Sequence, residues 1–137
     1  MNFRSEAEVD HFLASFESGA LPLYCWTHAA HIAMCAARLW DEDADTVNRI
    51  REGIQHYNHS QGIVTTPTYG YHETLTLFWV ETVREYLQET KPESRLAAVC
   101  GTIKTLGLDS GLPAKRYSFD VFQSVEARAR WIPPDRD

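Results

Sequence analysis

The stretch YHETLTLFWVETVREYLQET, residues 71–90, predicts the fold more directly than any other segment. Large apolar residues recur along it at spacings of three or four, which is the period of one helical face. They are Leu75, Trp79, Val83 and Tyr86. Further apolar side chains flank this stripe at Leu77, Phe78 and Val80, a pattern typical of a helix buried on several sides. We therefore predict a long helix here, at the centre of the fold.

Four more segments carry the same helical period. The first begins with a capping box, Ser5 followed three residues later by Glu8, and ends at Gly19. Two others are expected over about 25–40 and 45–59. A second capping-box spacing, Thr90 to Glu93, predicts the start of a fifth helix that Gly107 ends. Residues 108–137 are expected to be irregular, with short helical turns capped by Ser118 and Ser124.

The length and composition fit one globular domain. The chain has 137 residues, of which 44% are hydrophobic and 23% charged, values that are ordinary for a domain of this size. No stretch alternates like a strand and no internal repeat occurs. We predict an all-α single-domain bundle of about five helices over residues 1–137, with an irregular C-terminal segment. Such a domain needs neither a metal nor a disulfide to stay folded.

Charge and apolar runs argue against two classes of partner. The net charge is −6 and Lys and Arg do not cluster, so nucleic acid is not an expected partner. No apolar run approaches the ~20 residues that span a bilayer, so a membrane is not expected either. The three cysteines have no CxxC spacing and the N-terminus lacks a secretory pattern, which together predict a cytoplasmic protein with free thiols. A homodimer is left open.

Two histidines in the predicted second helix share one face. His28 and His31 are three residues apart, and His28 aligns with the apolar stripe through Ile32 and Cys35. An imidazole facing the core needs a partner, because an unpaired buried polar group costs about 1–3 kcal/mol. The partner can be a metal, a carboxylate or a backbone carbonyl, and hydrogen-bonded core histidines are the commoner outcome.

His72 and Glu73 begin the helix of residues 71–90. His72 precedes Leu75 by three residues and therefore lies on the buried stripe. Glu73 has two interpretations of equal weight: a first-turn acid that favours the positive end of the helix, or a metal ligand or general base.

Together these residues suggest a metal site. His28, His31 and His72 with Glu73 offer three nitrogens and one carboxylate, a set that suits a divalent metal ion such as zinc or iron. We predict a metal-binding protein, and a small metalloenzyme acting on a small-molecule substrate if Glu73 is catalytic. The alternative is a non-catalytic helical module that binds a ligand or partner and whose histidines are hydrogen-bonded in the core. A structural zinc that joins Cys25 or Cys35 to the histidines is a third interpretation.

Other candidate residues carry weaker signals. His11, His56 and His59 fall on polar faces and are expected to be solvated, whereas Asn58 can face inward. Tyr24, Tyr69 or Tyr71 could line the entrance of a site. Cysteine catalysis has little support, because Cys35 and Cys100 lie on apolar stripes.

Several blocks of the chain resemble an uncharacterised family of small bacterial helical proteins. These blocks are WTHxxH at 26–31, GYHETLT at 70–76, and a C-terminal YSxxxFxSxEARxxWxxPD pattern that begins at Tyr117. The resemblance covers most of the chain and implies a shared site at His28, His31, His72 and Glu73, without naming a substrate.

Three charged residues of the C-terminal block have two interpretations. Arg116, Glu126 and Arg128 could fold over the site and hold an anionic substrate. Surface ion pairing that fixes the tail is the commoner role of such residues.

Overall fold

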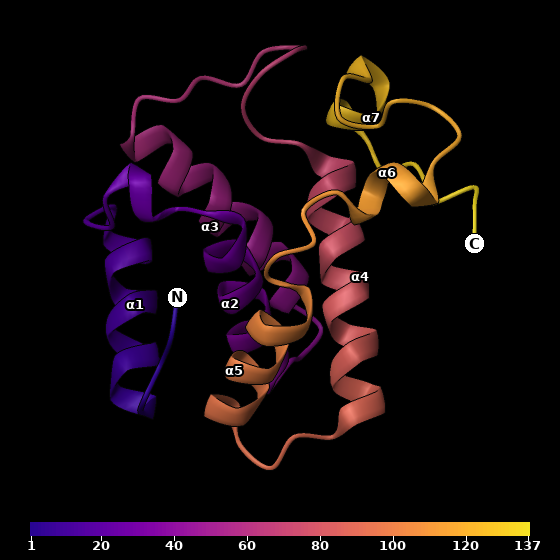
Figure 1. Cartoon of the computed structure of the whole chain (residues 1–137). Coiled ribbons are helices and arrows are strands. Elements are labelled where there is room, and N and C mark those ends of the chain that lie inside the picture. Colours follow the sequence, from indigo (N-terminus) through magenta and orange to yellow (C-terminus); the bar gives the residue numbers. More distant parts are fainter.

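A computed structural model describes all 137 residues. The chain is all-helical, with five long helices, a short 3-10 turn at Leu23–Cys25 and two short helices near the C-terminus (Figure 1). The long helices are α1 (Glu6–Ser18), α2 (His28–Leu39), α3 (Thr46–Ser60), α4 (Glu73–Thr90) and α5 (Arg95–Leu106). The short ones are α6 (Leu112–Arg116) and α7 (Val125–Ala129). The predicted all-α bundle with an irregular C-terminal segment is confirmed. No helix is both long and apolar enough to cross a membrane.

Most helix ends form as their caps predict. The Ser5 hydroxyl accepts a hydrogen bond from the Glu8 amide, and Gly19 ends α1 in the left-handed conformation. Ser124 caps α7 in the same way. The predicted cap at Thr90 is wrong: α4 extends through Thr90, and Ser94 caps α5 by accepting from the Ala97 amide. Ser118 caps no helix, and its backbone amide instead donates to the Asp135 carboxylate.

The central helix is α2, not α4 as the apolar pattern predicted. It packs against α5, α4 and α3, and eight of its twelve residues are buried. Several of these are alanines, whose small side chains let neighbouring helices approach closely. The apolar residues on several sides of α4 do not make it the central helix. They are needed because α4 contacts both the bundle and the C-terminal segment.

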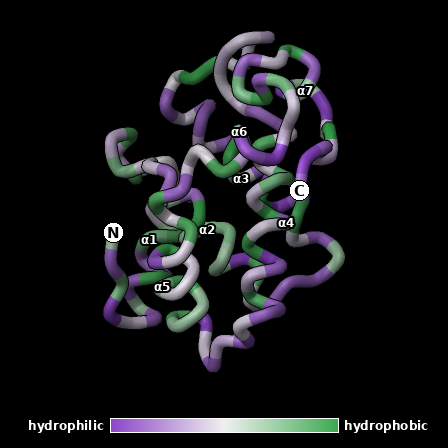
Figure 2. Tube along the Cα trace, turned by 45° about the vertical axis from the view of Figure 1, so that its right-hand side comes forward, coloured by the Kyte–Doolittle hydropathy of each residue, from purple (hydrophilic) through white to green (hydrophobic).

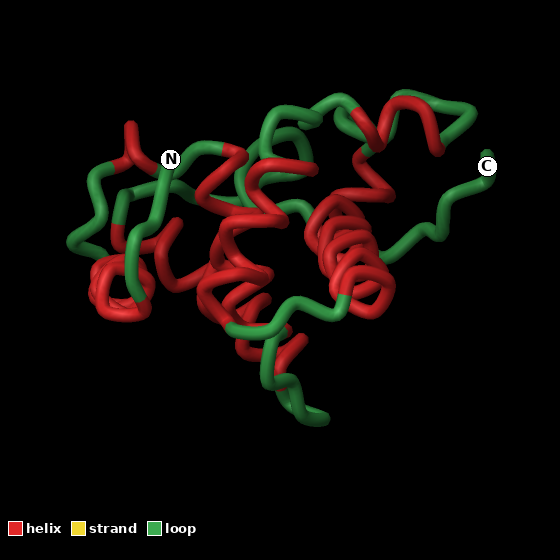
Figure 3. The backbone as a smooth tube through the Cα atoms, turned by 60° about the horizontal axis from the view of Figure 1, so that its bottom comes forward, coloured by secondary structure: helices red, strands yellow, loops and turns green.

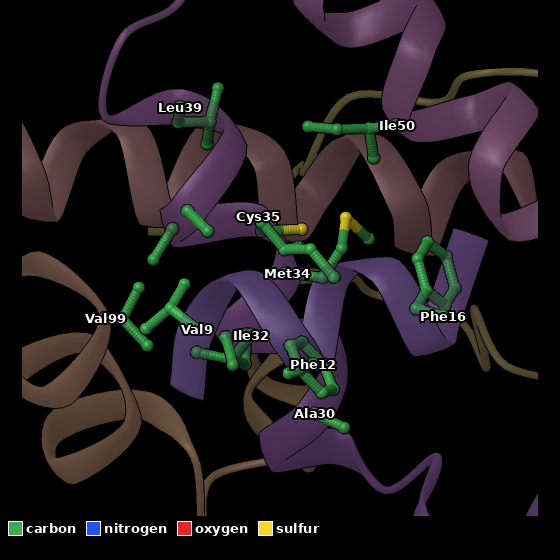
Figure 4. Close-up of a cluster of buried hydrophobic side chains, with 14 of the residues drawn as sticks. Val9, Phe12, Phe16, Ala30, Ile32, Met34, Cys35, Leu39, Ile50 and Val99 are labelled. Atoms are coloured by element: carbon green, nitrogen blue, oxygen red, sulfur yellow. The ribbon is translucent and has the colours of Figure 1, made fainter. Parts of the chain in front are cut away.

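Figure 4 shows the main core, where α1, α2, α3 and α5 meet. Phe16 of α1, Ile32 and Met34 of α2, Ile50 of α3 and Val99 of α5 are all almost completely buried. Apolar residues (green in Figure 2) recur along each helix among the polar ones, as the helical period requires. Truncating such a residue costs about 2–5 kcal/mol because the lost contacts leave a cavity.

A second, smaller core joins the C-terminal segment to α4. Phe78 of α4 packs with Tyr117, Val121 and Ala127, all of them buried. Figure 3 shows the loops and short helices of the C-terminal segment along one side of the long helices, without any strand. This second core fixes α6 and α7 over the start of α4, where His72 and Glu73 of the predicted site lie.

Candidate functional site

The predicted histidines line one cavity of about 530 Å³. It is partly open to solvent and is bordered by the first turns of α2, by α3, by the start of α4 and by the C-terminal segment. His28, His31 and His72 all lie in its wall. The aromatic part of the wall comes from Trp26, Tyr69, Tyr71, Trp79 and Phe122. A cavity of this size and mixed lining falls within the ordinary range of small-molecule sites.

His31 is the one histidine of the three whose buried nitrogen has no partner. Its Nε2 is shielded from solvent and forms no hydrogen bond. The ring packs edge-on against Trp26, with ring centroids 3.9 Å apart. Burial, with a smaller contribution from the positive form of His28, lowers the pKa of His31 to about 4. The imidazole is therefore neutral at physiological pH and offers one N–H donor and one acceptor.

His28 forms a hydrogen bond within the protein. Its Nε2 donates to the backbone carbonyl of Leu106, 3.0 Å away at the end of α5. The ring also lies against the Trp79 indole, with centroids 4.6 Å apart. His28 is thus a hydrogen-bonded wall residue that ties α2 to α5.

Both ring nitrogens of His72 are used by the fold. Nδ1 accepts from the Leu75 amide at 3.1 Å, which makes His72 the N-cap of α4. Nε2 lies 2.9 Å from the Val121 carbonyl and donates to it. His72 therefore holds the start of α4 and the C-terminal segment together through one neutral ring, 7% exposed.

Glu73 points into a different cavity. It lines a neighbouring polar cavity of about 450 Å³ together with Arg51 and Tyr71. Arg51 holds both carboxylate oxygens, and the Tyr71 hydroxyl donates to Oε1 at 2.6 Å. Burial opposes ionisation, but the hydrogen bonds from Arg51 and Tyr71 outweigh it and hold the pKa of Glu73 below its usual range. Glu73 thus fixes α4 to α3.

We expect Glu73→Gln to lower the free energy of unfolding by about 1–2 kcal/mol, because Arg51 would lose its charged partner in a partly buried pair. Arg51 is 35% exposed, so solvent screens part of the effect. Urea unfolding measures it. Glu126→Gln is the matched control, since the ion pair between Glu126 of α7 and Arg130, the residue after this helix, is well exposed. Equal losses in the two variants would contradict a structural role for Glu73.

The four-residue metal set is not formed. No three His, Cys, Asp or Glu side chains are grouped so that they could hold a metal ion. The physical reason is that His28, His72 and Glu73 each already have protein partners, and that Glu73 lies outside the histidine cavity. The structure thus places Glu73 apart from the three histidines, and its role as a ligand or general base stays a prediction. Metal binding itself stays a prediction.

Other predicted residues are placed largely as their periodicity indicates. His11, His56 and His59 are exposed, and Asn58 is buried with its side chain in the cavity wall. Tyr69 and Tyr71 line the cavity, whereas Tyr24 is 84% exposed and does not. Cys35 also lines it, but burial raises the pKa of this thiol to about 12, so the reactive thiolate is suppressed.

The charged C-terminal residues divide between their two interpretations. Arg116 donates to the Arg136 carbonyl and so fixes the tail, and Glu126 of α7 forms a surface ion pair with Arg130, the residue after this helix. Arg128 lines the histidine cavity. Sequence reasoning missed Arg51 and the wall residue Gln123. No local pattern marks either of them, because each acquires its role from a segment far away in the chain.

Comparison with protein-family models, with curated proteins and with solved structures found no match. The family resemblance of the sequence blocks therefore stays a prediction, and the site is interpreted from its own geometry.

Proposed function

We propose that this protein binds a small organic molecule with a planar, aromatic or heteroaromatic part, in the cavity between α2, α3, α4 and the C-terminal segment. It acts as a binding module, the non-catalytic alternative that the sequence left open. His31 forms a hydrogen bond to the ligand, and the rings of His28 and His72, which are hydrogen-bonded within the protein, form part of the cavity wall.

The observation that carries the proposal is the buried Nε2 of His31, which has no partner inside the protein. Leaving such a group unpaired costs about 1–3 kcal/mol, so a neutral imidazole in a cavity wall is a place where a ligand gains by supplying the missing hydrogen bond. Because Nε2 is covered by neighbouring atoms, we expect a small rotation of the His31 ring on binding.

The walls indicate the shape of the ligand. Trp26 and Trp79 each already pack against a histidine ring and lie on the same cavity. Aromatic faces favour offset or edge contacts with another flat ring, worth about 0.5–1.5 kcal/mol beyond area burial. The Asn58 amide in the same wall adds a donor and an acceptor.

A set of one- and two-ring aromatic fragments tests the proposal, with each fragment presented as a carboxylic acid and as its primary amide. We expect at least one fragment to bind and to shift the Trp79 indole and His31 imidazole NMR signals. His31→Leu should weaken that fragment at least about tenfold, equivalent to about 1.4 kcal/mol. The same variant should unfold no more easily than the wild type, because it removes an unpaired buried nitrogen.

The exposed His56 supplies the control, and His56→Leu should leave fragment affinity unchanged. Absence of binding across the set, or binding that shifts other signals and is indifferent to His31→Leu, would overturn the proposal.

A divalent metal is the competing candidate from the sequence. As placed, the residues do not fit it, since neither ring nitrogen of His72 can bind a metal without loss of the cap on α4, and Glu73 lies in the other cavity. Metal analysis of protein without a histidine tag distinguishes a metal site from a site for an organic ligand. About one equivalent of zinc or iron, lost in His72→Ala, would favour the metal over the organic ligand.

We also infer a reducing compartment, the cytoplasm, for this protein. Its three cysteines are free thiols, and Cys35 lies buried in the cavity wall. Free thiols persist where the cell keeps them reduced.

A further inference from the structure

We propose that the ligand of the histidine cavity is an anion, and that Arg128 is the group that attracts its carboxylate or other acidic group. This inference rests on the proposed function and adds the charge of the ligand to it.

The first observation is the charge of the cavity wall. The protein carries a net charge of −6, yet no Asp or Glu lines this cavity, and Arg128 is its single charged residue. The cavity is thus locally positive in a negative protein. A charge in a wall of low polarity acts strongly, because solvent screens it less than it would at the surface.

The second observation is that no carboxylate neutralises Arg128. Its Nη1 donates to the Gly70 carbonyl at 2.8 Å and its Nη2 to the Phe122 carbonyl at 3.2 Å. Nε is buried and has no partner. Glu73, in the adjoining cavity that Arg128 also lines, is held by Arg51 on both oxygens. A fixed guanidinium with a free N–H and no counter-charge is suited to an acidic group.

The charge of Arg128 also acts on His72, in the same cavity wall. Burial lowers the pKa of His72, and the charge of Arg128 lowers it further, against the hydrogen bond to the Val121 carbonyl, which raises it. His72 is thereby kept neutral. The cavity wall thus presents one positive charge, on Arg128, beside the neutral imidazoles of His31 and His72. This combination favours a ligand whose acidic group is attached to a flat ring.

A purely structural role for Arg128 makes a different prediction. Its two bonds to Gly70 and Phe122 join the loop before α4 to the C-terminal segment. If this bracing were its whole role, any substitution would lower stability, and acidic and neutral ligands would be affected alike.

The matched acid and amide fragments separate these roles. For fragments that bind the wild type, we expect the acid to bind at least about tenfold more tightly than its amide, and added salt to weaken the acid only. Arg128→Gln should reduce this preference to about twofold or less. Arg128→Lys should retain most of it, whatever its effect on stability. Arg116→Gln is the control and should leave the preference unchanged, because Arg116 is a half-buried arginine outside the cavity.

Each outcome has a definite meaning. Absence of binding by every fragment overturns the proposed function and this inference with it. Equal binding of acids and amides by the wild type leaves the binding function standing and overturns the anion inference alone, as does an unchanged preference in Arg128→Gln. If Arg128→Gln fails to fold, the wild-type preference and its salt dependence still decide whether the ligand is an anion, and the preference kept in Arg128→Lys tests the role of Arg128.

Discussion

His72→Ala is expected to lower the free energy of unfolding by about 3 kcal/mol, a large share of the stability of a domain of this size. Two losses add up. Removing the cap that Nδ1 provides to the Leu75 amide costs about 1 kcal/mol. Leaving the Val121 carbonyl without its donor costs about 1–3 kcal/mol more, because Val121 is completely buried. Urea unfolding at neutral pH measures the sum.

His72→Asn separates the two contributions. The asparagine side chain can still cap α4 but is too short to reach Val121, so about 1 kcal/mol, a third of the loss, should return. Hydrogen exchange adds a local measurement: in both variants the amides of α7 should exchange faster, since the C-terminal segment loses a tether to α4. Loss of less than about 1 kcal/mol in His72→Ala would refute this structural role. His11→Ala, at an exposed histidine, is the control.

Acidification from about pH 7 to 5 should lower the free energy of unfolding by about 2 kcal/mol through His31 alone. The pKa of this residue is about 4 in the folded protein, against an ordinary value of 6.5. The unfolded chain therefore takes up the proton first, so the contribution of His31 is complete above about pH 6.5 and is lost as the pH falls toward 4. His72, whose pKa is also lowered, acts in the same direction.

Denaturant unfolding at a series of pH values checks this expectation. The acids with lowered pKa values, Glu73 among them, lose their contribution only below about pH 4.5, so the window above it belongs to the histidines. His31→Leu should flatten the pH dependence in that window, whereas His56→Leu should not. A His31→Leu protein with an unchanged slope would show that His31 is not held neutral.

Much of the secondary structure follows from local patterns. The apolar period located all five long helices, and Ser5, Gly19 and Ser124 end or begin helices where their chemistry predicts. The wrong cap at Thr90 has a local cause too, since Ser94 offers an equivalent hydroxyl four residues later with no proline after it. Local competition of this kind shifts a helix end by a turn but leaves the helix in place.

Periodicity also predicted that His28, His31 and His72 face inward, and all three line one cavity. It could not show what each of them contacts. His28 and His72 bond to the carbonyls of Leu106 and Val121, which lie 78 and 49 residues away. Every residue has a backbone carbonyl, so such partners leave no mark in the amino-acid pattern. Arg51 likewise reaches Glu73 only because α3 and α4 meet.

The sequence by itself determined that this chain forms helices, where most of them begin and end, and which histidines face inward, because these properties depend on residues within one or two turns of each other. The tertiary structure alone decided that α2 is central, that His72 and Glu73 brace the fold, and that Nε2 of His31 and Nε of Arg128 have no hydrogen-bond partner. Those outcomes depend on which distant groups come within about 3 Å of each other, and such distances are set by the packing of whole helices.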